Sequence, residues 1–95
     1  MKVDLREKVS KLQEKFKSEF GIGIRVYKGA KFAPDVAIKE LIEPGHSGEE
    51  IEIAGQMKVG NVEKLFMDKF GIKTQIEDQS GNLADNSATI ASLRK

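Results

Sequence analysis

Two glycines flank a segment that stands where a phosphate-binding loop would lie. Gly55 and Gly60 have the G-x-x-x-x-G spacing and separate an expected strand from an expected helix. A phosphate-binding loop of this type continues with Lys and then Ser or Thr, which reach the phosphates and Mg²⁺. Asn61 and Val62 occupy those two positions here. We therefore interpret the segment as a glycine-relaxed turn between strand and helix, and the sequence predicts no cofactor.

The residues that could serve in catalysis do not form a recognisable set. His46 is the only histidine, and Ser47 beside it has no second base or carboxylate placed by the sequence to complete a triad. One imidazole in a flexible loop also makes a poor metal site. Asp35 and Asp85 stand near the starts of two expected short helices, where capping explains them. The chain has no cysteine, which excludes thiolate chemistry. The sequence thus predicts no catalytic residues, no metal site and no enzyme.

One pattern of residues occurs twice in the chain. Val59, Val62, Phe66 and Phe70 recur at steps of three and four, the period of one helix face. Fifty residues earlier, six positions carry identical residues: Lys8, Val9, Phe16, Phe20, Gly21 and Ile22 match Lys58, Val59, Phe66, Phe70, Gly71 and Ile72. The match predicts two repeats, about 1–43 and 50–95, joined by the loop 44–49. Because either half alone is too small to bury a core, we expect them to share one core in a single domain of residues 1–95.

Each repeat should contain the same order of elements. In the first, the apolar stripe predicts a helix over about 5–20, which Gly21 ends because glycine accepts a left-handed backbone. The alternation over 22–27 predicts a strand with one solvated face. Phe32 is then expected to fill a place in the core, and Pro34 to start a short helix.

The second repeat completes the expected fold. A strand is expected over 50–54, another over 72–76, and a short helix over about 86–93, while the match between repeats adds a strand at 1–4. Alternating strands are typical of a sheet with one open face. The predicted class is α/β, as an α+β-like two-layer sandwich. It is an internally duplicated β-α-β-α unit with four short strands and the two long helices on one sheet face. A right-handed crossover would make the two strands within each repeat parallel.

Composition describes an ordinary folded domain. The 95 residues are 39% hydrophobic and 33% charged, with a net charge of +1, which argues against a binder held mainly by phosphate contacts. No apolar run approaches the roughly 20 residues that a membrane span needs. The charged N-terminus lacks the apolar core of a signal peptide. We expect a cytoplasmic protein that does not bind membranes.

The expected open sheet face is the most useful candidate for binding. It should present residues from all four strands: Lys2, Asp4, Arg25, Tyr27, Glu50, Glu52, Lys73, Gln75 and Glu77. Of these and the adjoining turn, five are the candidate partner-binding residues: Arg25, Tyr27, Lys28, Lys73 and Gln75. Sheet aromatics can stack on the bases of single-stranded nucleic acid, but Tyr27 stands alone on this face and has acidic neighbours.

The sequence favours a non-enzymatic protein-interaction or regulatory module. Its partner would be another protein or a second copy of the chain, bound through the open face or an edge strand. The alternative is weak binding of single-stranded nucleic acid through Arg25 and Tyr27, helped by Lys28, Lys31 and Lys73. Salt discriminates between them, since affinity driven by phosphate contacts falls steeply as ionic strength rises.

Overall fold

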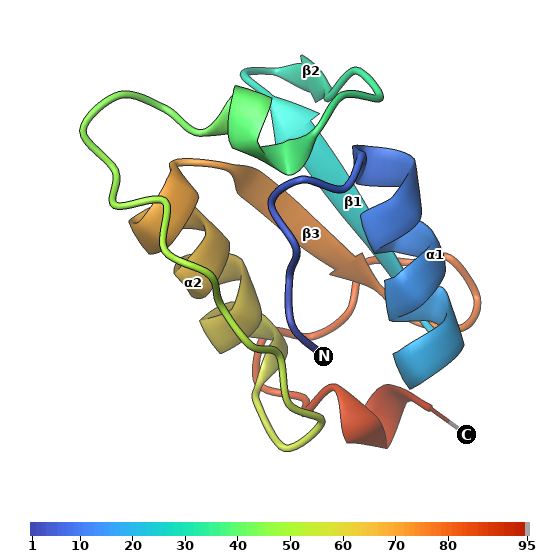
Figure 1. Ribbon diagram of the computed structural model, residues 1–95. Helices are drawn as coiled ribbons and strands as arrows, with labels where there is room; N and C mark the ends of the chain where they lie inside the picture. Colours follow the sequence, from blue (N-terminus) through green and yellow to red (C-terminus); the bar gives the residue numbers. More distant parts are fainter. Residues whose placement is uncertain (95) are drawn as a thin grey trace.

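Two helices cover one face of a three-stranded antiparallel sheet, and no helix of the described chain covers the other face (Figure 1). The computed structural model describes residues 1–94. The strands are β1 (Gly23–Lys28), β2 (Lys31–Phe32) and β3 (Lys73–Glu77), in the order β2-β1-β3. The helices are α1 (Val9–Phe20) and α2 (Val59–Phe70), with short 3₁₀ turns η1 (Ile38–Leu41) and η2 (Ala91–Leu93). This is an α+β architecture.

The two long helices follow the predicted apolar stripes. Their buried side chains are Val9, Leu12, Phe16 and Phe20 in α1, and Val59, Val62, Phe66 and Phe70 in α2. Gly21 and Gly71 end them with φ angles of 74° and 71°, the left-handed region that a glycine cap supplies. The predicted start of the first helix at Leu5 is wrong, because residues 4–7 form a turn in which Glu7 N–H donates to Asp4 C=O.

The sheet differs from the prediction in the number and direction of its strands. β1 and β3 come from different halves of the chain and run antiparallel, with Ile24 opposite Ile76 and Val26 opposite Thr74. The predicted parallel pairing within each repeat is therefore wrong. Gly21 and Gly71 turn each strand back along its own helix, and β1 then meets β3 as its neighbour. Residues 1–94 form three strands, whereas the sequence predicts four.

The two segments expected as further strands contact each other and stay outside the sheet. Lys2 and Glu52 form one isolated antiparallel bridge, and Val3 N–H donates to Ile51 C=O at 3.0 Å. The N-terminal segment runs in front of the sheet between α1 and α2 (Figure 1). Val3, Ile51 and Ile53 are buried, so these segments fill the space between the helices, where they cannot extend the sheet.

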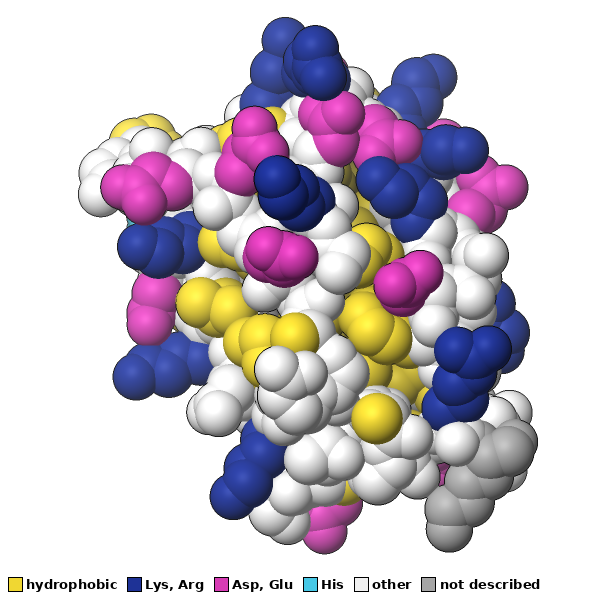
Figure 2. All heavy atoms as spheres, turned by 60° about the horizontal axis from the view of Figure 1, so that its bottom comes forward, with side chains coloured by type: hydrophobic (Ala, Val, Ile, Leu, Met, Phe, Trp, Pro, Cys, Tyr) yellow, Lys and Arg dark blue, Asp and Glu magenta, His cyan; other side chains and the backbone are white. Residues whose placement is uncertain are grey.

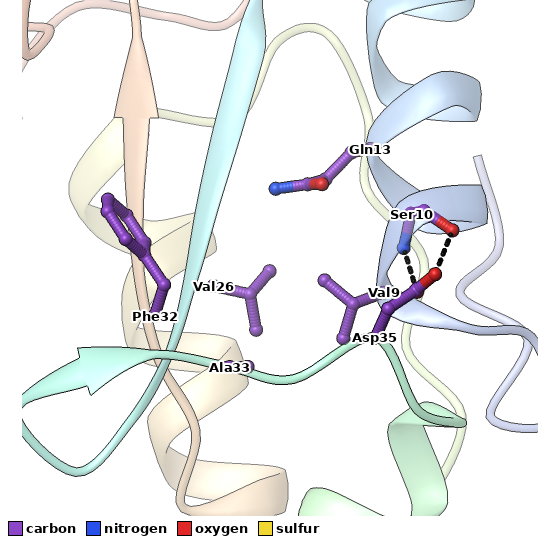
Figure 3. A pocket seen from close by; sticks show the side chains of 7 residues that line it. All are labelled: Val9, Ser10, Gln13, Val26, Phe32, Ala33 and Asp35. Carbon is purple, nitrogen blue, oxygen red and sulfur yellow. Dashed lines mark hydrogen bonds between the residues drawn. The ribbon is translucent and has the colours of Figure 1, made fainter.

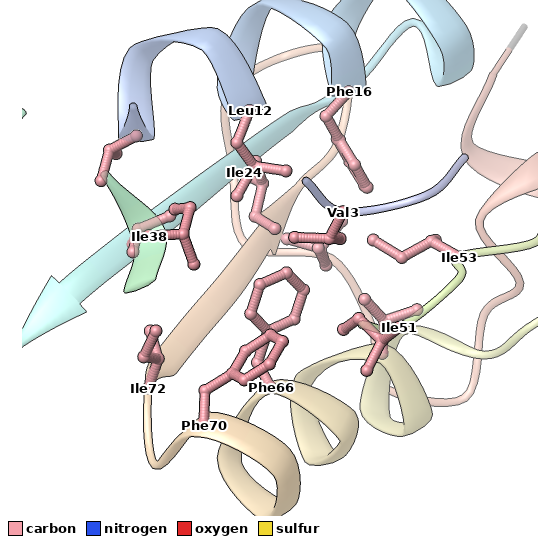
Figure 4. Close-up of a cluster of buried hydrophobic side chains, with 14 of the residues drawn as sticks. Val3, Leu12, Phe16, Ile24, Ile38, Ile51, Ile53, Phe66, Phe70 and Ile72 are labelled. Carbon is pink, nitrogen blue, oxygen red and sulfur yellow. The ribbon is translucent and has the colours of Figure 1, made fainter. Parts of the chain in front are cut away.

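The core draws on both halves of the chain (Figure 4). Phe16 packs edge-to-face against Phe20 with ring centroids 5.0 Å apart, and Phe66 against Phe70 at 5.8 Å. Val3, from the N-terminal segment, belongs to the same cluster as these rings. Burial of these side chains is the main term that stabilises the fold.

Two predicted details near the core are wrong. Phe32 is 67% exposed, because β2 continues the β1 hairpin and leaves the ring on the sheet surface. The short helices occupy only Ile38–Leu41 and Ala91–Leu93. Residues 33–37 form no helix, the chain bends at residues 35–36, and the Val36 C=O accepts the Val9 N–H at 3.0 Å. That contact holds the segment against the start of α1, so Pro34 lies outside any helix.

The two halves make matching backbone contacts. Ile38 N–H donates to Glu7 C=O and Ile90 N–H donates to Met57 C=O, both at 2.9 Å. Ile38 and Ile90 are both fully buried. Each isoleucine thus anchors a 3₁₀ turn against the loop that precedes a long helix.

Candidate functional site

The uncovered face of the sheet gathers four of the five predicted binding residues. In the register of β1 and β3, Arg25 lies opposite Gln75 and Tyr27 lies opposite Lys73. The residues between them are buried toward the helices, so these four point to the other side. We call the surface formed by Arg25, Tyr27, Phe32, Lys73, Gln75 and Glu77 the open face.

Tyr27 is the centre of the open face. Its hydroxyl donates a hydrogen bond of 2.7 Å to Gln75 Oε1. Its ring stacks on Phe32 with centroids 5.1 Å apart, and Lys73 Nζ lies 5.4 Å from the ring centroid. Aromatic stacking and cation–π contact both favour this arrangement, so the Tyr27 ring is held in place before any partner binds.

Phe32 is the functional candidate that the sequence interpretation missed. The sequence predicts a core position for Phe32, yet the ring stacks on Tyr27 from the neighbouring strand. A signal was present, because a tight turn between 28 and 31 predicts a hairpin and would place Phe32 opposite Tyr27. The expectation that Tyr27 is the lone aromatic of this face is therefore wrong.

Arg25 is already engaged by groups of the same chain. Its Nε donates to Glu77 Oε2, and its Nη2 donates to Gly81 C=O at 3.2 Å. The hydrogen bond to Glu77 is the main cause that raises the pKa of Arg25 above its ordinary value. A ligand phosphate would have to compete with Glu77 for this guanidinium, which weakens Arg25 as a phosphate contact.

Lys28 is the predicted residue that the structure does not bring to the open face. It stands at the end of β1 on the side of Val26, and its Nζ donates to Glu43 Oε1 at 2.9 Å. Lys2 and Glu52 also lie away from the sheet, in the bridge between the two N-terminal segments of the halves. Asp4 and Glu50 belong to the same segments, so the prediction that these four residues share the open face is wrong.

Two of the other sequence candidates, Asp35 and His46, contact groups of the long helices. Asp35 accepts hydrogen bonds of 2.9 Å from Ser10 N–H and Ser10 Oγ in the first turn of α1. These bonds lower the pKa of Asp35 below its ordinary value. His46 Nδ1 lies 3.3 Å from the Asp68 carbonyl near the end of α2. Across residues 1–94, no group of three or more His, Cys, Asp or Glu side chains is placed to hold a metal ion.

Charge is mixed on the surface that lies at the bottom of Figure 1. Figure 2 shows Lys and Arg side chains interspersed with Asp and Glu there, around a central group of hydrophobic side chains. A face of this kind has no field of one sign to attract a polyanion.

Within the described residues, no helix is both long enough and apolar enough to cross a membrane. Comparisons with protein families, with curated proteins and with solved structures found no match.

Proposed function

We propose that this chain is a non-enzymatic protein-interaction module that binds its partner through the open face. The observation that carries the proposal is the exposed ring of Phe32, stacked on a Tyr27 that Gln75 and Lys73 hold in place. Rigid aromatic side chains with one polar end supply much of the binding energy at protein interfaces, because ordering them costs little entropy.

Contact through the face is favoured over pairing at a strand edge. On the outer edge of β3, Ile76 N–H donates to Glu63 Oε2, and Ile76 C=O accepts the Ala84 N–H. The opposite edge strand, β2, has only two residues. Occupied backbone groups on β3 and the shortness of β2 both discourage addition of a full further strand, so we place the main contact on the face.

We infer that the chain is a fusion of two copies of one helix–strand unit. Six identical residues at a constant offset support this, as do the paired contacts of Ile38 and Ile90. A second copy of the whole chain is then the simplest partner, since two open faces can meet about a two-fold axis with identical contacts on both sides.

Sedimentation equilibrium over a wide concentration range tests self-association. The wild-type chain is expected to form dimers as concentration rises, and Phe32→Ser is expected to shift the curve toward monomer. Lys11→Ser on the exposed side of α1 is the control and should leave the association unchanged. A wild-type chain that remains monomeric at every concentration excludes the second copy as partner.

Affinity capture with wild type and Phe32→Ser side by side then tests for a foreign partner.

A second candidate function is weak binding of single-stranded nucleic acid. The stacked pair of Tyr27 and Phe32 favours it, because a base can stack on the outer face of Phe32. Titration with a labelled oligonucleotide at low salt tests it. Binding that weakens steeply with salt and is lost in Phe32→Ser supports this function, and no binding at low salt excludes it.

A further inference from the structure

The two halves differ in the side chain that contacts the edge of the strand from the matching position of the long helix. In the second half, Glu63 of α2 reaches β3, and its Oε2 accepts the Ile76 N–H at 3.1 Å. Gln13 stands fifty residues earlier at the matching position of α1. Its Nε2 donates instead to the Ile24 C=O at 3.0 Å. The glutamine therefore offers a donor to its strand where the glutamate offers an acceptor.

Val26 is left with an unpaired backbone N–H as a result. Val26 is the counterpart of Ile76 in the first half. The Val26 C=O accepts the Ala33 N–H and the Ile76 C=O accepts the Ala84 N–H, both at 2.9 Å. The N–H and C=O of one strand residue point to the same edge, so the Val26 N–H lies on the Ala33 side of β1. Within residues 1–94 no acceptor forms a hydrogen bond with it. Val26 is only 2% exposed, and buried N–H groups without a partner are rare.

A cavity of about 320 Å³ lies at this position (Figure 3). Its lining comes from α1, β1, β2 and the segment after β2: Val9, Ser10, Gln13, Val26, Phe32, Ala33 and Asp35. Val9, Val26 and Ala33 supply an apolar wall, and Figure 3 shows the Asp35 carboxylate at one side, bonded to Ser10. Those bonds stabilise the charged form of Asp35, so the rim is negative at neutral pH.

We propose that this cavity binds an extended peptide segment, one of whose backbone carbonyls accepts the Val26 N–H. The carbonyl would take the place that Glu63 Oε2 takes beside Ile76 in the other half. A small apolar side chain fits against Val9 and Ala33, and a basic residue beside it complements Asp35. A free carboxylate is a poorer ligand, because Asp35 repels it. This peptide site is distinct from the proposed partner site on the open face, although Phe32 borders both. The peptide proposal does not depend on the proposed function.

The test is a ¹H–¹⁵N NMR titration of the full chain with acetyl-Val-Lys-amide. The Val26 amide signal is expected to shift downfield and to saturate as its N–H gains an acceptor. Acetyl-Val-Glu-amide is expected to bind at least threefold more weakly. In Gln13→Glu the new carboxylate should cap the Val26 N–H as Glu63 caps Ile76, and the affinity for the Lys peptide should fall at least tenfold. Glu63→Gln, the matched change in the other half, should leave the affinity unchanged.

Two further measurements keep the outcome decisive. In Asp35→Asn, the Lys and Glu peptides should bind with equal affinity. This measurement remains informative even if Gln13→Glu does not fold. N-methylacetamide, a single peptide unit, should bind more weakly than the Lys peptide. The proposal is overturned if no peptide saturates the Val26 signal, which would mean that only water fills the cavity. Equal binding to wild type and to a folded Gln13→Glu overturns it as well, and so does N-methylacetamide binding as tightly as the peptide.

Discussion

Glu63 accepts the backbone N–H of Ile76 at 3.1 Å and so joins the middle of α2 to the outer edge of β3. This contact closes the edge against a further strand and fixes the helix on the sheet. Partial burial is the larger influence on the carboxyl and raises its pKa above the ordinary value, while the bond from Ile76 opposes that shift.

Glu63→Gln should flatten the pH dependence of stability above the ordinary carboxyl pKa. The pKa of Glu63 is higher in the folded chain than in the unfolded chain. The contribution of Glu63 to the free energy of unfolding is therefore fully present below the unfolded pKa and is lost as the pH rises through the folded pKa. Urea unfolding of wild type and variant from pH 4 to pH 8 measures this, and the amide oxygen of Gln still accepts the Ile76 N–H. A difference between the two proteins that does not change with pH would contradict the assignment.

Asp35→Asn should weaken the loss of stability that the wild-type chain shows as the pH falls. Hydrogen bonds from Ser10 lower the pKa of Asp35 in the folded chain, so its contribution is present above the unfolded pKa and is lost as the pH falls through the folded pKa. The acid-side loss of stability in wild type should therefore be smaller in the variant. Acid titration followed by circular dichroism measures it, with Asp68→Asn as a control carboxylate on α2 that has no side-chain hydrogen bond among the described residues.

Phe16→Ala and Phe66→Ala should each destabilise the whole chain by roughly 3–5 kcal/mol. Both rings are fully buried in one cluster that contains residues of both halves. Denaturant unfolding should show a single cooperative transition in each variant. Lys11→Ala, on the exposed side of α1, should change stability by no more than about 0.5 kcal/mol. Two separate transitions, each sensitive to one substitution, would show that the halves fold independently.

Thr74→Val should stabilise the chain by about 1 kcal/mol, because it removes a buried hydroxyl that lacks a partner. Thr74 is 2% exposed, and its Oγ1 has no hydrogen-bond partner. The matching position of the first half is Ile24, which is also buried. Thr89→Val is the contrasting change, since Thr89 Oγ1 accepts the Ser92 N–H at 3.2 Å, and it should not stabilise. Thermal unfolding compares the two variants, and destabilisation by Thr74→Val would point to an unseen partner of the hydroxyl.

Gly71→Ala should cost more than Gly29→Ala. Both glycines have positive φ, 71° and 65°, which costs an alanine about 1–2 kcal/mol. A Cβ at Gly71 would also stand 2.7 Å from His46 Nε2 and 2.9 Å from Glu43 Cβ, whereas at Gly29 it meets nothing within 4 Å. The difference between the variants therefore measures how firmly the loop 43–48 packs on the end of α2. Equal losses in chemical denaturation would show that the loop simply moves aside.

The sequence by itself determined the elements whose signals are local. The stripe from Val59 to Phe70 and its copy from Val9 to Phe20 repeat with the period of a helix. Gly21 and Gly71 end the helices because a left-handed backbone suits glycine. The alternation of Ile72, Thr74 and Ile76 likewise shows which side of β3 is buried. These features depend on a few neighbouring residues, so they could be predicted, and so could the side of the sheet on which Arg25, Tyr27, Lys73 and Gln75 lie.

Only the tertiary structure decided which segments pair. The bridge of Lys2 with Glu52 and the antiparallel register of Arg25 with Gln75 join residues fifty apart. Periodicity cannot encode them, because an alternating strand fits a parallel or an antiparallel neighbour equally well. The same holds for Phe32, whose apolar ring indicated a core position until the β1–β2 hairpin placed it on Tyr27. The unpaired Val26 N–H is also a tertiary result, since it depends on which way Gln13 turns when α1 packs beside the sheet.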